Sequence, residues 1–279
     1  MRIAGVLSLA IVLITAIPAV ASADSSKFVG LKGDPNLRSA SAIVLDGNGD
    51  IIFSKDTDTV RSIASITKLM TAMVILDAQL DLEEELTITK ADRDLIRLTG
   101  SRLDAGAKLT RRELLLLALM SSENRAATAL GRTYPGGMDK FVAQMNRKAK
   151  SLGMNNSRFA DPAGLRTENL STANDLARML TAAKGYPLIT QATTTLREEV
   201  RPYSRRGPLN YVNTNRLLKN TQWDIELSKT GYINEAGRCL VMQANIEGEP
   251  ISIVLLNSFG KLTPFGDSNR LRQWMLASN

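Results

Sequence analysis

Two short, mostly apolar, strand-like runs occur early in the chain. They cover residues 41–45 and 51–54, and the turn-forming sequence Asp-Gly-Asn-Gly-Asp lies between them at positions 46–50. Two strand-like runs joined by such residues predict a β-hairpin. The segment before them, residues 24–40, is polar and is expected to be loosely ordered.

Helical spacing of apolar residues follows in the middle of the chain. Apolar residues recur every three or four positions over residues 65–76, which predicts a largely buried helix. Residues 110–152 have helical character as well, with a polar break at 121–124 and a separation at Gly136-Gly137. Another helix is expected at residues 172–183.

Strand-like segments return in the last third, at residues 226–232, 239–246 and 251–257, and a closing helix is expected at 267–276. Strands at both ends with helices between them indicate an α/β fold. We expect an antiparallel sheet built from both chain ends and flanked by helices. A mainly helical subdomain is inserted at about residues 85–165.

The first 23 residues have the pattern of a secretory signal peptide. Arg2 supplies a positive charge, an uncharged apolar run follows to Val20, and Ala21-Ser-Ala23 is a small-residue cleavage site. A retained membrane anchor is the alternative, although Pro18 and the cleavage site favour removal. No later segment is long and apolar enough to span a bilayer, so we expect the mature chain, residues 24–279, in the periplasm without a stable membrane anchor.

The 279 residues include no histidine. This excludes a Ser-His-Asp triad, a Cys-His pair and any histidine-ligated metal site, and neither a metal nor a cofactor is predicted. If the chain is a hydrolase, its base is a carboxylate, a lysine or an amine. The one cysteine, Cys239, cannot form an intrachain disulfide and is expected to be a buried strand residue.

The formal net charge is +7. A basic exported protein is attracted to anionic surfaces such as cell-wall polymers. Nucleic acid is not expected as a partner, because no nucleic-acid-binding motif is present and aromatic residues make up only 5% of the chain.

Ser65 and Lys68 form an S-x-x-K pair at the start of a predicted helix. Residues three apart share one helix face, so the lysine amine can approach the serine hydroxyl. Lysine acts as a base only if its pKa falls from about 10.4 toward neutrality, which burial and a neighbouring cation can achieve. Taken alone, Ser65 could equally be an ordinary capping residue. Ser258 and Lys261 repeat the spacing, which we interpret as coincidence.

Two further motifs follow. Ser122-Glu-Asn124 interrupts the helix that a capping box of Thr110 and Glu113 begins; it is either a simple helix junction or a pair of side chains facing a cleft. Lys229-Thr-Gly231 lies on a predicted strand. A glycine there suggests close approach of another backbone, such as a bound peptide. The alternative is an exposed lysine on an edge strand.

The order S-x-x-K, S-x-N and K-T-G resembles the motif set of penicillin-binding proteins and serine β-lactamases. The sequences around Ser65, Ser122 and Lys229, together with Asp161-Pro-Ala-Gly-Leu, resemble those of the low-molecular-mass D-alanyl-D-alanine peptidases. Tyr134-Pro-Gly-Gly and the Ser-Ser-Glu-Asn sequence are similar to the penicillin-binding protein 7 group of D,D-endopeptidases. The resemblance implies a β-lactamase/transpeptidase-like fold and an enzyme that cuts D-alanyl cross-links in peptidoglycan and binds β-lactam antibiotics covalently.

The resemblance also implies roles for the motif residues. Ser65 is the nucleophile, Lys68 its base, and Ser122 passes a proton to the leaving amine. Substrate binding falls to Asn124, Lys229, Thr230, Gly231 and Tyr232. Lys229 is expected to help lower the pKa of Lys68, and the backbone N–H groups of Ser65 and Tyr232 to form an oxyanion hole.

Three alternatives stay open. A D,D-carboxypeptidase that releases terminal D-alanine has the same motifs. A β-lactamase is disfavoured, because no glutamate stands in the region of Asp161-Pro-Ala-Gly-Leu. A non-catalytic wall-binding protein would not need intact motifs.

Overall fold

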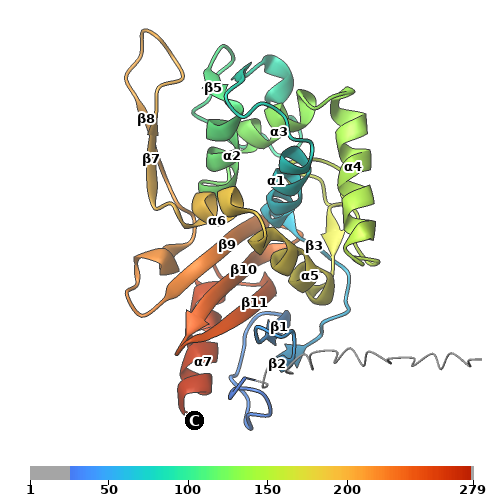
Figure 1. Cartoon of the computed structure of the whole chain (residues 1–279), viewed down its shortest axis with the longest axis vertical. Coiled ribbons are helices and arrows are strands. Elements are labelled where there is room, and N and C mark those ends of the chain that lie inside the picture. The colour runs from blue at the N-terminus through green and yellow to red at the C-terminus, as the bar shows by residue number, and fades with distance from the viewer. Residues whose placement is uncertain (1–25, 278–279) are drawn as a thin grey trace, which may run out of the picture.

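The computed structural model describes residues 26–277, which fold around a five-stranded antiparallel sheet (Figure 1). The order across the sheet is β2-β1-β11-β10-β9, so strands from the two ends of the chain pair with each other. The strands are β1 Ser41–Leu45, β2 Ile51–Lys55, β9 Asp224–Ile233, β10 Gly237–Ile246 and β11 Glu249–Ser258. The predicted α/β fold class is confirmed. The predicted signal peptide lies outside the described residues.

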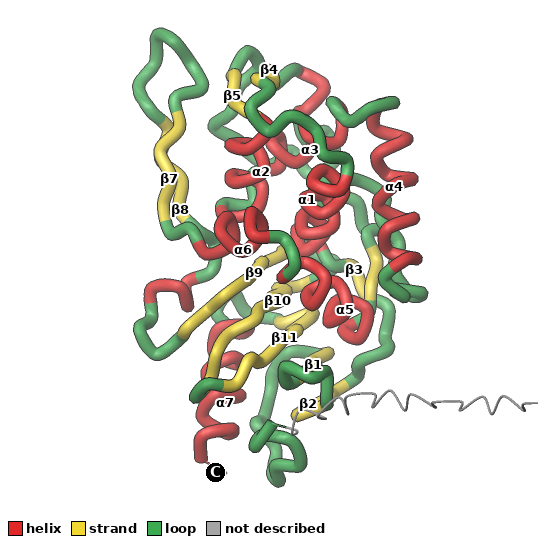
Figure 2. Tube along the Cα trace, in the orientation of Figure 1, coloured by secondary structure: helices red, strands yellow, loops and turns green. Residues whose placement is uncertain are grey.

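Helices cover both faces of this sheet (Figures 1 and 2). The C-terminal helix α7 packs on one face, and α5 and α6 pack on the other. Helices α1 to α4 gather beyond α5 and α6, at the end of the molecule away from α7. The helices are α1 Thr67–Asp77, α2 Arg111–Met120, α3 Asn124–Arg132, α4 Gly137–Ser151, α5 Ala173–Lys184, α6 Pro187–Thr194 and α7 Thr263–Ala277.

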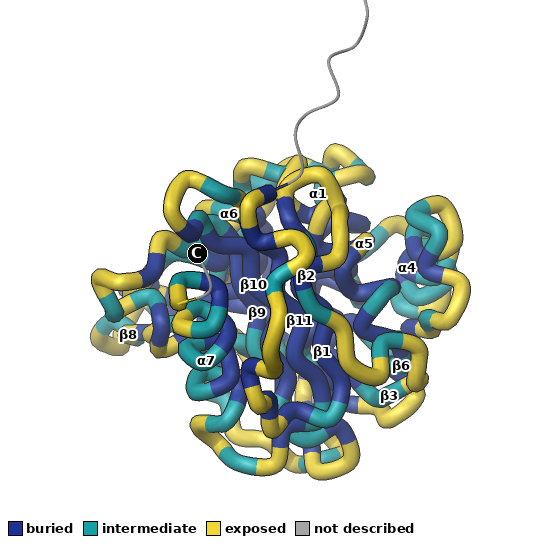
Figure 3. The backbone as a smooth tube through the Cα atoms, turned by 90° about the horizontal axis from the view of Figure 1, so that it is seen from below, coloured by how far each residue is buried: buried dark blue, intermediate teal, exposed yellow. Residues whose placement is uncertain are grey.

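The alternation of side chains along each strand separates two hydrophobic cores. On β11, Val254 and Leu256 face the core shared with α1 to α6, whereas Ile253 and Leu255 face the core shared with α7. Strands β10 and β11 are therefore apolar on both faces and appear as buried segments in Figure 3. This two-sided burial explains why their sequences are almost continuously hydrophobic.

Three short strand pairs accompany the main sheet. Each pair is antiparallel and consists of two segments that lie outside the five-stranded sheet. They are β3 Arg61–Ser62 with β6 Leu170–Ser171, β4 Glu85–Thr87 with β5 Lys108–Thr110, and β7 Arg197–Val200 with β8 Leu209–Val212. Figure 1 shows the β7–β8 hairpin extending beside α2.

The main departures from the predicted elements are α6, the β7–β8 hairpin and the start of α7. The α6 sequence contains three threonines, which are weak helix formers, and only Pro187 at its start indicated a helix. The hairpin is stabilised by tertiary contacts such as the hydrogen bond from the Asp104 N–H to the Tyr203 hydroxyl, 2.6 Å. Helix α7 begins at Thr263, four residues earlier than expected.

The described part of the segment before β1 has no helix or strand, but it is not loosely ordered. Phe28 is fully buried in the core with α7. The Ser26 N–H donates to Asp46 in the hairpin turn, 3.1 Å. The expectation of loose order is wrong, because apolar residues within this polar segment fill a gap beside the sheet.

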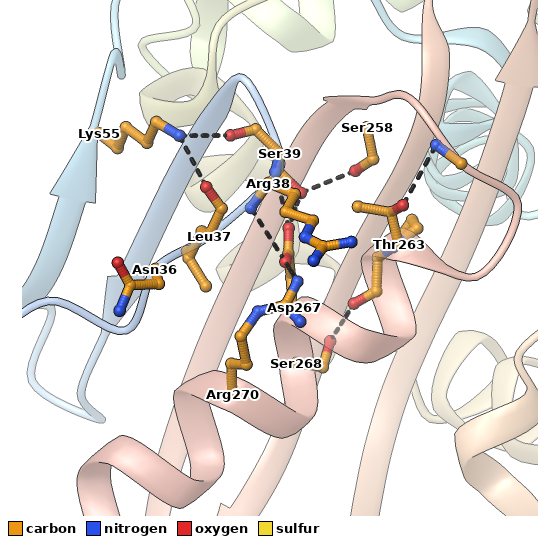
Figure 4. Close-up of polar contacts among 12 residues, drawn as sticks. Asn36, Leu37, Arg38, Ser39, Lys55, Ser258, Thr263, Asp267, Ser268 and Arg270 are labelled. Carbon is orange, nitrogen blue, oxygen red and sulfur yellow. Dashed lines mark hydrogen bonds and ion pairs between the residues drawn. The ribbon is translucent and has the colours of Figure 1, made fainter.

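A polar cluster with a buried centre at Ser39, Ser258 and Asp267 joins the two ends of the chain (Figure 4). We call it the terminal clasp; its residues are Ser39, Lys55, Ser258, Asp267 and Arg270. Asp267 accepts hydrogen bonds from the Ser39 N–H (2.7 Å) and hydroxyl (2.5 Å) and pairs with Arg270. Lys55 donates to the Ser39 carbonyl, 2.9 Å. The clasp fixes α7 and β11 to the segment that leads into β1.

Candidate active site

Ser65 lies in a short 3₁₀ turn, η1 Ala64–Ile66, that leads directly into α1. Ala64 has a φ of 48°, in the left-handed region that a side chain rarely occupies. Such strain persists only where the surroundings impose it, and it often marks a functional site. The turn presents Ser65 to a cleft while Lys68, one turn later, points inward.

Lys68 is completely buried and contacts three oxygen atoms. Its Nζ lies 2.8 Å from Ser65 Oγ, 2.8 Å from Asn124 Oδ1 and 2.6 Å from the Ala163 carbonyl oxygen. The expected approach of amine and hydroxyl is therefore present in the folded chain.

Burial lowers the pKa of Lys68 to about 7, and the negative charges of Asp161, Glu123 and Asp94 oppose this shift. The expectation that the charge of Lys229 lowers it is not supported. The repulsion between the two amines falls instead on Lys229, whose pKa is held well below its usual range by burial and then by Lys68. A substantial share of Lys68 is neutral at pH 7 and can accept a proton.

The polar break between α2 and α3 is confirmed and has unusual backbone geometry. Ser122 has a φ of 61°, and the Glu123 side chain caps α3 by accepting the Arg125 N–H, 3.1 Å. The reversal turns Ser122 and Asn124 toward the same cleft. Ser122 Oγ accepts a hydrogen bond from Lys229 Nζ, 2.9 Å.

Lys229 is buried, and the alternative of an exposed edge-strand lysine is wrong. Leu227 and Ile233 on β9 belong to the core shared with the helices. Because side chains alternate along a strand, Lys229 projects to the same face, toward the α2–α3 junction. Its Nζ also donates to the Thr230 carbonyl, 2.9 Å.

Gly231 is required by close backbone packing within the chain itself. A Cβ atom there would lie 2.8 Å from the Ile63 carbonyl oxygen and 3.2 Å from Ser65 N. Gly164 approaches the same turn from the other side, where a Cβ would lie 2.0 Å from the Ala64 carbonyl oxygen. The bound peptide invoked from the sequence is thus not needed to explain Gly231, since two glycines enclose the backbone turn that carries Ser65.

One cleft of about 740 Å³ is lined by Ser65, Ser122, Asn124, Thr230, Gly231 and Tyr232, whereas Lys68 and Lys229 are buried and do not line it. Tyr232 stands at its rim with its side chain 47% exposed, and the Arg238 guanidinium stacks 3.6 Å from the centre of the tyrosine ring. Four basic side chains line the cleft, and none has an ion-pair partner within residues 26–277: Arg216, Lys219, Arg238 and Lys261. The cleft is therefore suited to an anionic ligand.

The chain matches the family model described as D-alanyl-D-alanine carboxypeptidase, peptidase S11, over residues 30–260. It belongs to this family of serine peptidases. The D-alanyl-D-alanine endopeptidase of Pseudomonas aeruginosa is 48% identical to it, with 91% of this chain and 82% of the relative aligned. The Escherichia coli protein of the same name is also 48% identical, with 86% and 78% aligned.

The fold of this peptidase agrees with solved structures of the family. The DD-transpeptidase of a Streptomyces strain superposes with a TM-score of 0.81 at 27% identity, covering 88% of this chain and 100% of the other. The resemblance inferred from the motifs is confirmed.

The sequence interpretation missed the contribution of the loop at Asp161. Its carboxylate accepts the backbone N–H groups of Ala163 (2.7 Å), Gly164 (2.6 Å) and Arg166 (2.8 Å). This places the Ala163 carbonyl against Lys68. The group of the Asp161-Pro-Ala-Gly motif that contacts Lys68 is the backbone carbonyl of Ala163. The side-chain types of the motif therefore did not predict this contact.

The second S-x-x-K sequence does not form a site. Ser258 is fully buried in the terminal clasp, with its Oγ 2.7 Å from Ser39 Oγ, whereas Lys261 is exposed. Cys239 is buried on β10 as expected, and burial raises the pKa of its thiol to about 11. Among the residues described, no helix has the length and apolarity needed to cross a bilayer.

Proposed function

We propose that this S11 peptidase is a periplasmic D,D-endopeptidase that hydrolyses D-alanyl cross-links in peptidoglycan through an acyl-enzyme on Ser65. The contact of 2.8 Å between Lys68 Nζ and Ser65 Oγ, in a cleft without histidine, carries the proposal. Two relatives named D-alanyl-D-alanine endopeptidase, each 48% identical over most of both chains, support the choice of substrate.

Acylation begins with Lys68. A neutral amine has two hydrogens and one lone pair. The Asn124 Oδ1 and Ala163 carbonyl oxygens accept the two hydrogens, so the lone pair remains for the hydroxyl proton of Ser65. As this proton moves to Nζ, Oγ attacks the D-alanyl carbonyl carbon and the carbonyl oxygen becomes negative. The backbone N–H groups of Ser65 and Tyr232 stabilise that oxyanion, at about 3 kcal/mol for each donor.

The tetrahedral intermediate then collapses by breaking the peptide C–N bond. The leaving amine takes the Ser122 hydroxyl proton, and the proton that Lys68 took from Ser65 replaces it, so Lys68 is neutral again. Lys229, hydrogen-bonded to the Ser122 hydroxyl, supports this transfer. In the second half of the reaction, water loses a proton to Lys68 and attacks the acyl-enzyme ester. The products are a D-alanyl carboxylate, a free amine and the regenerated serine.

Charge and hydrogen bonding favour an anionic peptide substrate. Thr230 Oγ1 lies 2.6 Å from Thr214 Oγ1 and lines the cleft. With the Thr214 hydroxyl as donor between the two, the Thr230 hydroxyl hydrogen is available to a substrate carboxylate or amide oxygen. The four unpaired cations of the cleft are complementary to the carboxylates of wall peptides. Asn124, Gly231 and Tyr232 complete the substrate-binding set, and no cofactor takes part.

Localisation in the periplasm rests on the signal-peptide pattern of residues 1–23, with cleavage after Ala23. The mature domain is residues 24–279, and the segment at about 85–165 forms its helical subdomain. β-Lactam antibiotics are expected to acylate Ser65 without rapid release. Asp161 occupies the region where class A β-lactamases have a glutamate, but its oxygens already accept backbone N–H groups, so it is not free to activate water.

Purified enzyme incubated with cross-linked muropeptide dimers tests this function. Release of monomers is expected from the wild type and not from Ser65→Ala. If dimers stay intact while a pentapeptide yields free D-alanine, the D,D-carboxypeptidase alternative is correct. If neither substrate is cleaved and penicillin does not label the protein, the enzymatic proposal fails altogether.

A further inference from the structure

A loop beside the nucleophile continues the hydrogen-bond network of the active site. We call residues 93–99 the Asp94 loop. Asp94 is 6% exposed, and its carboxylate accepts the backbone N–H groups of Ile96 (2.9 Å), Arg97 (2.9 Å) and Thr99 (3.0 Å). It also accepts the Thr99 hydroxyl, 2.7 Å. The loop is thus folded around one buried carboxylate.

Hydrogen bonds connect the Asp94 carboxylate to Lys68 through Thr99 and Asn124. The carboxylate determines which atom is the donor and which the acceptor in each of them. An ionised carboxylate only accepts, so the single hydroxyl hydrogen of Thr99 points toward Asp94. Thr99 Oγ1 then presents only lone pairs and accepts Asn124 Nδ2, 2.9 Å. The other end of the amide, Asn124 Oδ1, must therefore face Lys68 Nζ, 2.8 Å.

The amide direction matters because it decides where the Lys68 lone pair points. With Oδ1 facing Nζ, the amine donates to Asn124 and keeps its lone pair for Ser65. If the amide were reversed, Nδ2 would donate to that lone pair and compete with the Ser65 hydroxyl. The reversed amide would also stop stabilising the protonated amine.

We propose that Thr99 is a positioning residue, which holds the Asn124 amide in the orientation that keeps Lys68 directed at Ser65. The proposal rests on the proposed function only in taking Lys68 as the base. Thr99 acts through Asn124, and two successive hydrogen bonds connect it to Lys68. Its hydroxyl, and not its methyl group, is the feature that this role needs.

Thr99→Val tests the role, because it removes the hydroxyl and keeps the shape. We expect the rate of acylation by a fluorescent penicillin to fall about tenfold, the effect of roughly 1.4 kcal/mol, while Thr99→Ser retains the rate. Thr87→Val, an exposed threonine on β4, is the matched control and should leave the rate unchanged. Equal rates in wild type and Thr99→Val, or equal losses in Thr99→Val and Thr99→Ser, would overturn the proposal.

The pH dependence separates positioning from loss of structure. The charged groups around Lys68 are Lys229, Asp161, Glu123 and Asp94. Thr99→Val removes none of these charges; Asp94 loses the Thr99 hydroxyl but keeps its three backbone N–H donors. Loss of the Oδ1 contact disfavours the ammonium form, so the acidic limb of the acylation profile should move to lower pH while the maximum rate falls. A reduced maximum with an unmoved limb would indicate a structural effect and contradict the proposal.

A double-mutant cycle with Asn124→Ala shows whether Thr99 acts through the amide. Without Asn124, the Thr99→Val substitution should cause no further loss of acylation rate. A second tenfold loss would overturn the assignment. If Thr99→Val does not fold, Thr99→Ala takes its place in the same cycle. If only the role of Thr99 is wrong, the wild-type protein is still labelled by penicillin and still cleaves muropeptides. If the proposed function is wrong, the wild-type protein does neither.

Discussion

This peptidase has two polar clusters with buried centres, and each contains the serine of an S-x-x-K sequence. They differ in which groups are the partners of their buried charged side chains. In the terminal clasp, Asp267 accepts hydrogen bonds from the Ser39 N–H and hydroxyl and pairs with Arg270. At the active site, Lys68 and Lys229 are equally buried, but neither forms an ion pair within residues 26–277. Their partners are neutral oxygens.

This difference distinguishes a cluster that stabilises from one that reacts. In the clasp, the buried Asp267 carboxylate has a cation, Arg270, as its ion-pair partner. A buried amine with neutral partners has a lowered pKa and can exchange a proton near pH 7. The active site also adjoins a cleft and contains strained residues at Ala64 and Ser122, whereas Ser258 is sealed from solvent. The burial, the hydrogen-bond partners and the access to a cleft, and not the S-x-x-K spacing alone, decide whether the serine and lysine of the motif can react.

The largest expected effect is the loss of covalent labelling in Ser65→Ala. The bond to penicillin forms at Ser65 Oγ, so labelling by a fluorescent penicillin should disappear entirely. Ser258→Ala is the matched control, because it alters the same sequence pattern in the clasp. Residual labelling of Ser65→Ala, mapped to another residue by mass spectrometry, would refute the nucleophile assignment.

Lys68→Ala should reduce the acylation rate about 10³-fold, within the range for loss of a general base. No histidine is present to replace the amine. Stopped-flow measurement with a chromogenic β-lactam gives the rate, and Lys150→Ala, on the exposed surface of α4, is the comparison. A loss below tenfold would mean that another group activates Ser65.

Lys229→Ala should slow acylation about 10- to 100-fold. The change leaves the Ser122 hydroxyl without its donor, and a polar group left without its partner costs roughly 1–3 kcal/mol. Lys150→Ala, on the exposed surface of α4, is the control. Full retention of the labelling rate in Lys229→Ala would contradict a role for this lysine.

The acylation rate should depend on pH through Lys68. Because the pKa of Lys68 is lowered to about 7, the neutral base predominates above that pH. The rate should therefore fall about tenfold for each unit of pH below about 6. Rates measured from pH 5 to pH 9 test this; a profile that stays flat down to pH 5 would assign the proton transfer to a group of lower pKa.

The smallest effect on activity is expected from the clasp. Ser39→Ala removes a hydroxyl from buried Asp267 and should lower the free energy of unfolding by about 1–3 kcal/mol, measured by denaturant unfolding. The acylation rate of the folded variant should equal that of the wild type. A parallel loss of acylation would show that the two clusters are coupled.

Local rules made much of this fold predictable from sequence. The capping box of Thr110 and Glu113 begins α2 as expected, and the hydrophobic periods separated the strands of both chain ends from the helices between them. The capping box and the hydrophobic periodicity depend on residues close together in sequence, so they can be predicted without the tertiary structure. The S-x-x-K spacing likewise placed Lys68 beside Ser65, because residues three apart meet on one helix face.

Other features depend on contacts between distant segments. The sequence gives no indication that Gly164 and Gly231 enclose the nucleophile turn, or that Thr99 reaches Asn124 from another loop. Burial of Lys229 follows from the face of β9 that meets the α2–α3 junction, and its lowered pKa follows from that burial. The sequence by itself determined which groups were available and their local geometry. Only the tertiary structure decided which of them lose water and gain partners, because solvation and proximity are properties of the packed chain.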